Sequence, residues 1–260
     1  MRSCTVFEKK SENHSESART ITFPVSLLMP VCNEIEVIES VITEWVEVVF
    51  QYLPEGSEIL IDEAASSDGT KDILKGLAAK FPFLKVTYND QKDGFRAAAL
   101  RLYKTAKCPI VFFTDSDGQY VAADFWKLAP WIEEFDFVRG AKIARMDPLI
   151  RRFASFVFNR LVWFLFFPKY SDVNCAFHMI KRDVLLSLID EIVCLPVHPN
   201  AELLLRAELG NISIKQVYIF HRSRQFGKSK GLPDYRLVLD SLMAIKGLYD
   251  IKKSYLKLKV

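Results

Sequence analysis

Short apolar runs alternate with helical segments along the first half of the chain, and this alternation constrains the fold more than any other feature. Each run is rich in β-branched or aromatic residues and is bounded by Pro, Gly or polar residues, as buried strands are. The predicted strands cover residues 23–31, 58–61, 83–88 and 109–114. The predicted helices between them cover residues 35–53, 70–80 and 95–107. Strands and helices in alternation imply a parallel sheet covered on both faces.

The second half continues with a similar mixture of elements. We predict strands over 137–143 and 212–220, a helix over 148–166, a strand or loop over 172–180, two further helices, and an amphipathic helix from about Pro233 onward. In parallel sheets, ligands bind at the carboxyl ends of the strands. The polar segments that follow the first, second and fourth strands are therefore expected to converge on one crevice.

Charge and cysteine content exclude several classes of protein. The net charge is +3, and no stretch carries the dense basic patch that nucleic-acid binding needs. The five cysteines are odd in number and include no Cys-x-x-Cys pair, so we predict neither a disulfide framework nor a zinc site, in a reducing cytosolic setting. Residues 1–20 lack a secretory apolar core, and the apolar run 153–167 is shorter than the about 20 residues that span a bilayer. We therefore expect no transmembrane helix.

An acidic turn directly follows the fourth predicted strand. Asp115 and Asp117 lie two residues apart at the strand end, where both carboxylates can turn toward one cation, and Gln119 could add an oxygen. Magnesium commonly takes one or two carboxylates together with substrate phosphates. Asp, Ser and Gly are also frequent in β-turns, so this segment taken alone fits a simple polar turn as well.

Four segments occur in a fixed order that resembles a known family. They are Pro30-Val31-Cys32-Asn33-Glu34, Glu63 to Thr70, Asp115 to Gln119, and Arg224 to Lys230. Together they resemble the motifs of family-two glycosyltransferases, most of all the dolichol-phosphate mannose synthase group and related polyprenyl-phosphate glycosyltransferases, over about residues 22–235. The resemblance implies the GT-A fold, an α/β fold with a mixed, mainly parallel sheet flanked by helices. It also implies amphipathic C-terminal helices at an interface.

The resemblance implies a binding site for a GDP- or UDP-sugar. Asp115, Asp117 and Gln119 would hold Mg²⁺ or Mn²⁺ against the donor diphosphate, and Asp117 and Arg224 would be the catalytic residues. The donor-binding residues would be Pro30, Asn33, Glu34, Glu63, Asp68, Asp115, Ser116, Lys228 and Ser229. Glu63 would contact the base or ribose. The segment that contains Arg224 and Lys228 would close over the phosphates.

The sequence departs from the family pattern inside the second motif. The family usually has two Asp and a Gly at the positions of Glu63, Ala64 and Ala65, and an apolar residue at the position of Asp62. Further departures are Cys32, where Tyr is frequent, and Arg96, where a second Gly is frequent. These differences bear on which nucleotide is bound. Ser66 to Thr70 alone also fits an ordinary helix cap.

The acceptor side carries cationic residues. Lys142, Arg151 and Ser155 resemble the acceptor-phosphate residues of the mannose synthase group, and Arg151 and Ser155 are spaced to share a helix face. A lipid phosphate, with a second pKa of about 6, is already ionised near neutrality. A hydroxyl acceptor needs a general base, and Ala201-Glu202-Leu203 lacks the Glu-Asp pair of hydroxyl-using relatives. Residues 145–152 also fit a solvated basic stretch.

Two helical segments fit a membrane surface. Residues 153–167 are apolar nearly all round, which indicates either contact with a polyprenyl tail or burial in a core. The C-terminal helix interleaves Lys with Leu and Tyr, so it could lie on anionic lipid, dock a membrane-protein partner, or be solvated. The implied domains are a flexible lead (1–20), a GT-A catalytic domain (21–232) and a C-terminal amphipathic helix (233–260).

We therefore expect a metal-dependent glycosyltransferase that moves a sugar to polyprenyl (dolichyl or undecaprenyl) phosphate, with inversion. It would be cytoplasmic and peripheral at the cytoplasmic face of a membrane. One alternative is transfer to a sugar hydroxyl in surface polysaccharide synthesis, with Glu202 or Asp172 as the base. A second alternative, motivated by Ala64, is an inactive binding or scaffold relative.

Overall fold

A seven-stranded sheet runs through the part of the protein that the computed structural model describes, which comprises residues 21–143, 149–166, 170–223 and 234–258. The strands are β1 (Val25–Val31), β2 (Glu58–Ala64), β3 (Leu84–Asn89), β4 (Ile110–Phe113), β5 (Phe137–Ile143), β6 (His178–Lys181) and β7 (Ile214–Phe220). Their order in the sheet is β3-β2-β1-β4-β6-β5-β7. The predicted flexible lead, residues 1–20, lies outside the described residues.

The sheet is mixed and mainly parallel, which confirms the predicted fold class. Strand β1 pairs in parallel with β2 and β4, β2 pairs in parallel with β3, and β5 pairs in parallel with β7. Strand β6 is antiparallel to both of its neighbours, β4 and β5. The predicted strand 137–143 and the predicted helix 70–80 are confirmed to the residue.

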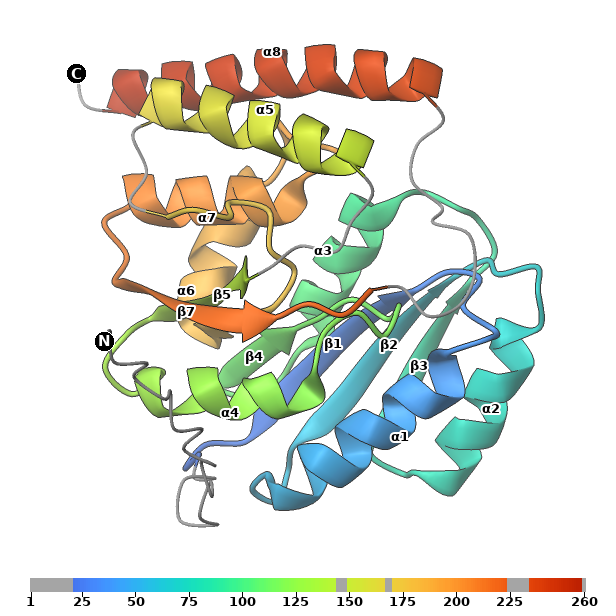
Figure 1. The fold of residues 1–260 in the computed structure, drawn as a ribbon. Helices are drawn as coiled ribbons and strands as arrows, with labels where there is room; N and C mark the ends of the chain where they lie inside the picture. The colour runs from blue at the N-terminus through green and yellow to red at the C-terminus, as the bar shows by residue number, and fades with distance from the viewer. Residues whose placement is uncertain (1–20, 144–148, 167–169, 224–233, 259–260) are drawn as a thin grey trace, which may run out of the picture.

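Helices cover both faces of the sheet, and two more form an outer layer (Figure 1). The helices are α1 (Ile38–Val48), α2 (Thr70–Lys80), α3 (Phe95–Thr105), α4 (Phe125–Leu128), α5 (Leu149–Phe166), α6 (Arg182–Leu188), α7 (Pro199–Leu209) and α8 (Asp234–Leu258). Helices α1, α2 and α4 lie on one face, and α3, α6 and α7 lie on the other (Figure 1). Helices α5 and α8 lie side by side over α7. The sequence did not predict α4 or the 3₁₀ turns beside it.

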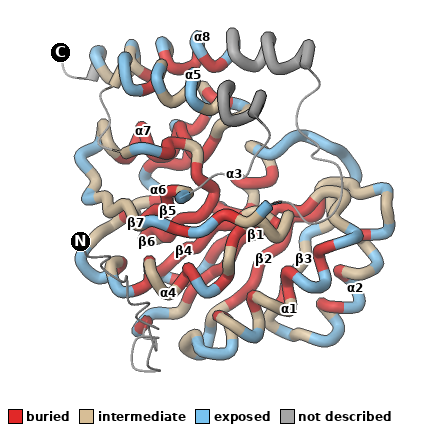
Figure 2. Tube along the Cα trace, in the orientation of Figure 1, coloured by how far each residue is buried: buried red, intermediate tan, exposed pale blue. Residues whose placement is uncertain are grey.

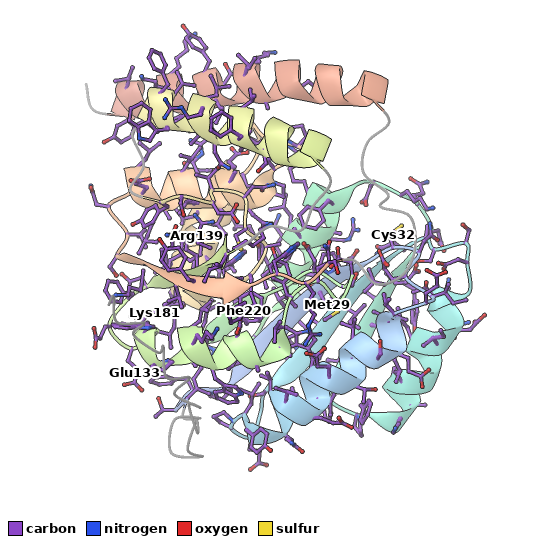
Figure 3. All side chains as sticks on the ribbon, viewed as in Figure 1. Met29, Cys32, Glu133, Arg139, Lys181 and Phe220 are labelled. Atoms are coloured by element: carbon purple, nitrogen blue, oxygen red, sulfur yellow. The ribbon has the colours of Figure 1, made fainter. Side chains whose placement is uncertain are left out.

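The central strands are buried on both sides. All seven residues of β1 are buried, and Met29 lies in the middle of the sheet (Figures 2 and 3). Strands covered on both faces read as continuous apolar runs, which is why β1 and β4 were visible in the sequence. Aromatic rings fill the space against α1, where Phe112 lies 5.3 Å from Trp45 and 4.8 Å from Phe177 between ring centroids.

Helix α8 is held on the molecule by buried apolar residues and polar contacts. Leu248 and Ile251 are fully buried, the Arg206 guanidinium of α7 donates a 2.9 Å hydrogen bond to the Ser254 hydroxyl, and Lys252 Nζ donates to the Leu165 carbonyl oxygen at 3.0 Å. At Gly247 the helix passes directly over the Cys194 carbonyl. Among the described helices, none is both long and apolar enough to cross a membrane.

The close approach at Gly247 gives a test of how α8 packs. A Cβ at this position would lie 2.3 Å from the Cys194 carbonyl oxygen, so Gly247→Ala should lower the free energy of unfolding by about 1–3 kcal/mol through overpacking. The matched control is Gly76→Ala in α2, where nothing lies within 4 Å of the new Cβ. That change should stabilise the protein by up to about 1 kcal/mol through helix propensity. Denaturant unfolding of both variants checks this, and stabilisation by both would contradict the packing.

Candidate functional site

A cavity of about 310 Å³ opens where the carboxyl ends of β1, β2 and β4 meet the start of α3. Its lining residues are Pro30, Val31, Cys32, Glu34, Ala64, Lys92, Gly94, Phe95, Ala98, Asp115, Ser116 and Asp117. Cys32, labelled in Figure 3, marks the end of β1. Four of the predicted donor-binding residues, Pro30, Glu34, Asp115 and Ser116, line this cavity together with Asp117, which was predicted as a metal and catalytic residue. The cavity therefore lies where ligands bind in parallel sheets.

Asn33 shapes the rim of the cavity without lining it. Its backbone is in the left-handed region (φ 54°), which asparagine adopts more readily than most residues. Its side-chain oxygen accepts a 2.7 Å hydrogen bond from the Ser67 amide, and its own amide donates to the Ser66 hydroxyl at 2.8 Å. Asn33 thus ties the loop after β1 to the loop after β2. The structure shows Asn33 positioning these loops, and its predicted role in donor binding stays a prediction.

The Asp68 side chain makes hydrogen bonds within the loops and not in the cavity. Its carboxylate accepts hydrogen bonds from the Thr70 amide and hydroxyl at 3.1 and 2.6 Å, and from the Ile35 amide at 3.3 Å. Burial would raise the pKa of Asp68, but these hydrogen bonds outweigh it and lower the pKa below its usual value. The charged carboxylate closes the start of α2, and it does not line the cavity.

The predicted contact of Glu63 with a base or ribose does not fit its position. The residue is 0% exposed and does not line the cavity. Its Oε1 accepts a 2.6 Å hydrogen bond from the Ser66 amide, which closes the turn that holds Ala65 at φ 49°. The physical reason is strand alternation, because neighbouring residues in β2 face opposite sides of the sheet. The following residue, Ala64, lines the cavity instead.

Asp115 and Asp117 form the acidic end of the cavity. Burial raises the pKa of Asp115 to about 7, the negative charges of Asp117 and Glu34 add to this rise, and the positive charge of Lys142 opposes it. Asp117 Oδ1 accepts a hydrogen bond from the Gln119 amide at 3.1 Å. A raised pKa beside a second carboxylate marks a place where a cation would relieve repulsion.

The donor set at this end fits a hard divalent ion that shares its ligands with a substrate. No group of three or more His, Cys, Asp or Glu side chains that could hold a metal occurs among the described residues. Two carboxylates alone suit Mg²⁺ or Mn²⁺, which take further oxygens from water and phosphates. Gln119, predicted as a metal ligand, uses its side-chain NH₂ to donate a 3.1 Å hydrogen bond to the Arg222 carbonyl. Gln119 therefore holds the segment that leads to Arg224.

The predicted closing loop lies outside the described residues, as do Arg224, Lys228 and Ser229. The residues directly before this loop are described. The Arg222 amide donates a 2.7 Å hydrogen bond to the Gln119 carbonyl, and Tyr120 and His221 form an isolated β-bridge. Residues 221 and 222 thus lie beside Gln119 and Tyr120, which directly follow the acidic turn.

Lys142 lies between the acidic turn and Asp172. Its Nζ is 3.9 Å from Asp172 Oδ2 and 5.7 Å from the Tyr120 ring centroid, and its charge acts on Asp115. The buried Arg139 guanidinium (labelled in Figure 3) donates a hydrogen bond to the Asp172 carbonyl oxygen and so fixes this segment.

The other two predicted acceptor-phosphate residues lie in α5. Ser155 Oγ accepts a hydrogen bond from Asn159 at 3.5 Å, and the side chain of Arg151 lies outside the described part of the chain. Asn159 in turn accepts a 3.3 Å hydrogen bond from the Val173 amide. This contact joins α5 to the segment that begins at Asp172.

Glu202 is not placed to act as a general base. Its carboxylate is 0% exposed and accepts hydrogen bonds from the backbone amides of residues 193–195 at 2.6–3.1 Å. The Arg206 guanidinium also contacts it at 3.3 Å. These contacts fix the loop that supports α8. Of the two carboxylates predicted as possible general bases, Asp172 remains, and it lies beside Lys142.

Sequence reasoning missed the part of the cavity wall that comes from the loop before α3 and from the start of α3. Lys92, Gly94, Phe95 and Ala98 form this wall, from the loop before α3 and its first turns. Their position after the third strand of a parallel sheet was the available signal, because that loop must reach the same edge as the other strand ends.

Comparison with known proteins places the chain in a family. The model of glycosyl transferase family 2 matches residues 26–188. This match covers more than half of the chain, and the chain therefore belongs to glycosyl transferase family 2.

Two curated relatives carry more specific names. Glycosyltransferase AglD of Haloferax volcanii is 24% identical over 218 residues, which cover 80% of this chain and 34% of the relative. An undecaprenyl-phosphate 4-deoxy-4-formamido-L-arabinose transferase of Pseudomonas fluorescens is 25% identical over 215 residues, which cover 80% of this chain and 60% of the relative. The chain thus spans less than two thirds of either relative.

Solved structures establish the fold. Glucosyl-3-phosphoglycerate synthase of Mycobacterium tuberculosis superposes with a TM-score of 0.67 at 21% identity, over 92% of this chain and 83% of the synthase. The same synthase in complex with Mn²⁺, UDP and phosphoglyceric acid gives a TM-score of 0.68 at 20% identity, over 91% of this chain and 81% of the synthase. The GT-A fold that the four motifs implied is confirmed.

The raised pKa of Asp115 predicts a pH dependence of metal binding. Below pH 7 this carboxyl is protonated and a cation must displace its proton, so affinity for Mn²⁺ should fall as the pH falls through about 7. Lys142→Met removes the charge that lowers the pKa of Asp115, so the fall should move to higher pH. Mn²⁺ titration between pH 6 and 8.5 checks both. Lys75→Met, on the exposed side of α2, is the control. A midpoint that Lys142→Met leaves in place would contradict the electrostatics.

Proposed function

We propose that the chain transfers a sugar from a nucleotide sugar, GDP- or UDP-linked, to a polyprenyl phosphate. The observation that carries this proposal is the cavity at the strand ends, with Asp115 and Asp117 at its acidic end and Lys142 close behind them. Family membership and the name of the undecaprenyl-phosphate relative support the same reading. The proposed cofactor is Mg²⁺ or Mn²⁺, as in the synthase complex that contains Mn²⁺ and UDP.

We assign one group of residues to the metal and the donor, and another group to the acceptor. Asp115 and Asp117 would bind the divalent ion, and that ion would offset the charge that develops on the departing diphosphate. A phosphate oxygen of the acceptor forms a bond to the anomeric carbon as the bond to the nucleoside diphosphate breaks, with inversion at that carbon. We assign Lys142, Arg151 and Ser155 to binding the acceptor phosphate.

The phosphate acceptor fits the site better than a sugar hydroxyl. A phosphate is already ionised near neutrality and needs positive charge, which Lys142 supplies. A hydroxyl needs a general base, and Glu202 is fully engaged with backbone amides. Asp172 lies 3.9 Å from Lys142, so this carboxylate is partnered by a cation. The inactive scaffold is disfavoured because both carboxylates of the acidic turn line an open cavity.

A transfer assay tests the proposed function. Purified protein, Mn²⁺ and a panel of UDP- and GDP-sugars are incubated with undecaprenyl phosphate or dolichyl phosphate in vesicles, and lipid-linked sugar is measured. Asp117→Asn should lower the rate by about a hundredfold or more, the scale for losing one electrostatic stabiliser of a transition state. Asp183→Asn, in the first turn of α6, is the matched control and should be neutral. Transfer to free sugars and not to the lipid phosphate would favour the hydroxyl acceptor.

We also propose that the outer layer of α5 and α8 lies on the cytoplasmic face of a membrane. Exposed positions recur along both helices (Figure 2). The large exposed apolar side chains are Phe156, Val157, Trp163 and Phe164 in α5, and Met243, Ile245, Tyr249 and Leu256 in α8. Arg160, Lys246 and Lys253 are exposed among them, and Asp250 is the one acidic residue among the described side chains of these helices. Apolar and cationic groups together suit anionic lipid.

Vesicle binding tests this surface. Phe164 is 68% exposed, so Phe164→Glu should leave the fold intact and weaken binding to anionic vesicles by about tenfold or more, the cost of losing one buried aromatic. The matched control is Tyr218→Glu on β7, a residue that is 60% exposed and lies outside the outer layer. Equal binding by both variants in vesicle co-sedimentation would remove α5 from the proposed surface.

A further inference from the structure

Two segments that are far apart in the chain lie against each other directly after the acidic turn. Strand β7 ends at Phe220, which is labelled in Figure 3, and the residues after it run beside residues 119–120. The Arg222 amide donates a 2.7 Å hydrogen bond to the Gln119 carbonyl oxygen, and the Gln119 side-chain NH₂ donates to the Arg222 carbonyl oxygen at 3.1 Å. Gln119 is therefore held by Arg222 through both its main chain and its side chain.

Helix α1 joins both segments through one carboxylate. The Arg222 guanidinium donates to both carboxylate oxygens of Glu44, at 2.9 Å to Oε2 and at 3.0 Å to Oε1. Glu44 Oε1 also accepts a 3.3 Å hydrogen bond from the Ala122 amide, in the chain that leaves the acidic turn. A bidentate pair of this kind fixes the relative orientation of its two groups, because both hydrogen bonds must be satisfied together. The pair therefore fixes Arg222 relative to α1 and to the residues after the turn.

The residue that Arg222 holds also orients Asp117. The Gln119 amide donates a 3.1 Å hydrogen bond to Asp117 Oδ1. A carboxylate that binds a metal is commonly oriented by hydrogen bonds from the groups behind it, and the loss of such a group lowers metal affinity. A chain of hydrogen bonds thus runs from Arg222 through Gln119 to a carboxylate that we assign to the metal.

The acidic turn rests on the face of α1 that carries Glu44. Gly118 has φ 72°, in the left-handed region that favours glycine. A Cβ at this glycine would lie 3.3 Å from Val41 Cγ2, so the turn packs closely on α1. Val41 and Glu44 are three residues apart and therefore share one face of the helix. One face of α1 thus supports both the acidic turn and the ion pair.

The exposure of the ion pair favours a positioning role over a stabilising one. The side chains of Arg222 and Glu44 are 40% and 29% exposed. Ion pairs at such exposure contribute little to the free energy of folding, because water and salt screen the charges. The geometry of the pair is nevertheless defined by its two hydrogen bonds. We therefore expect its loss to change the position of the turn more than the stability of the fold.

We propose that the Glu44–Arg222 ion pair positions Asp117 for the divalent cation by holding Gln119 in place. The inference rests on the proposed function, because it assumes that Asp115 and Asp117 bind the cation. Glu44 and Arg222 are positioning residues that act through Gln119, whereas Asp117 itself binds the ion.

Binding of Mn²⁺ tests this role, because the free ion gives an electron paramagnetic resonance signal that the bound ion loses. Wild type, Arg222→Gln, Glu44→Gln and the double variant are titrated with Mn²⁺ at one fixed pH, both alone and with UDP or GDP. Each single variant should raise the Kd for Mn²⁺ by about tenfold, the scale for losing a group that orients a metal ligand. The double variant should bind no more weakly than either single variant, because both residues act through one pair.

Controls keep a loss of folding apart from a loss of positioning. Glu44→Gln retains an oxygen that can accept from the Ala122 amide, so this variant removes the charge of the pair and little else. Lys181→Gln is the matched control, because it breaks the 2.9 Å Lys181–Asp136 pair, whose side chains are 36% and 34% exposed. Lys181 lies beside the first residue of β4, at the far end of that strand from the acidic turn. It should shift the thermal midpoint as little as Arg222→Gln does and should leave the Kd for Mn²⁺ unchanged.

A conservative variant adds a readout that depends on the geometry of the pair. Arg222→Lys keeps the positive charge but replaces the planar fork by a point charge, which cannot form two parallel hydrogen bonds with Glu44. Its Kd for Mn²⁺ should therefore lie between those of wild type and Arg222→Gln. A Kd equal to that of Arg222→Gln would show that the charge of the pair has no part in positioning.

Each other result overturns a defined statement. If wild type binds no Mn²⁺ under either condition, or binds it no better than Asp117→Asn, the metal assignment in the proposed function fails and the inference fails with it. If Asp117→Asn loses binding while Arg222→Gln and Glu44→Gln bind as wild type does, the inference alone fails. Additive losses in the double variant would overturn the pair as the acting unit. An equal loss of affinity in Lys181→Gln would reduce the effect to general destabilisation and would also overturn the positioning role.

Discussion

The parallel pairing of β1 with β2 and β4 is the constraint on which the rest of the site depends. Its register sets Val31 opposite Glu63 and Leu28 opposite Phe113, so the three strands deliver their following loops to one edge of the sheet. The loop after β1 brings Glu34, the end of β2 brings Ala64, and the turn after β4 brings Asp115 and Asp117. These groups are far apart in the chain, and strand pairing alone places them around one cavity.

Buried polar groups in β2 complete this arrangement from inside the sheet. Glu63 faces one side and holds the turn at Ser66, whereas Asp62 takes part in the pair with Arg101 on α3. Neither carboxylate lines the cavity. Glu63, which stands where the family usually has an Asp, thus supports the loop after β2. The small residue Ala64 lines the cavity instead. Ala64 is also apolar, so the end of β2 adds no charge to the cavity lining.

Much of the fold could be predicted because buried parallel strands leave a direct trace in the sequence. The run 58–61 was recognised, but β2 extends to Ala64, because Asp62 and Glu63 break the apolar pattern while staying in the strand. The partners of Asp62, Arg101 and Asn89, lie too far along the chain for any local pattern to show. The turns from 122 to 131 were missed because they are short and lack helical periodicity over a useful window.

The candidate site could be predicted where acidic residues directly follow a recognisable strand. It could be predicted less well where polar side chains bind the backbone of the loops. Asp115 and Asp117 follow a recognisable strand and line the cavity as predicted. Asn33, Asp68 and Glu63 are polar as a donor site requires, but their side chains accept hydrogen bonds from backbone amides of the loops. These contacts form only in the folded chain. Lys92 lies outside the four motifs, and its place in the cavity lining becomes visible only in the folded chain.

The most direct test of the account is a crystal structure of the protein soaked with Mn²⁺ and UDP or GDP, with manganese located by its anomalous signal. The account predicts one manganese peak between the carboxylates of Asp115 and Asp117. It also predicts the diphosphate on the metal and the nucleoside in the cavity at the ends of β1, β2 and β4. Manganese or nucleotide bound away from the ends of β1, β2 and β4, or an empty cavity under saturating nucleotide, would contradict it.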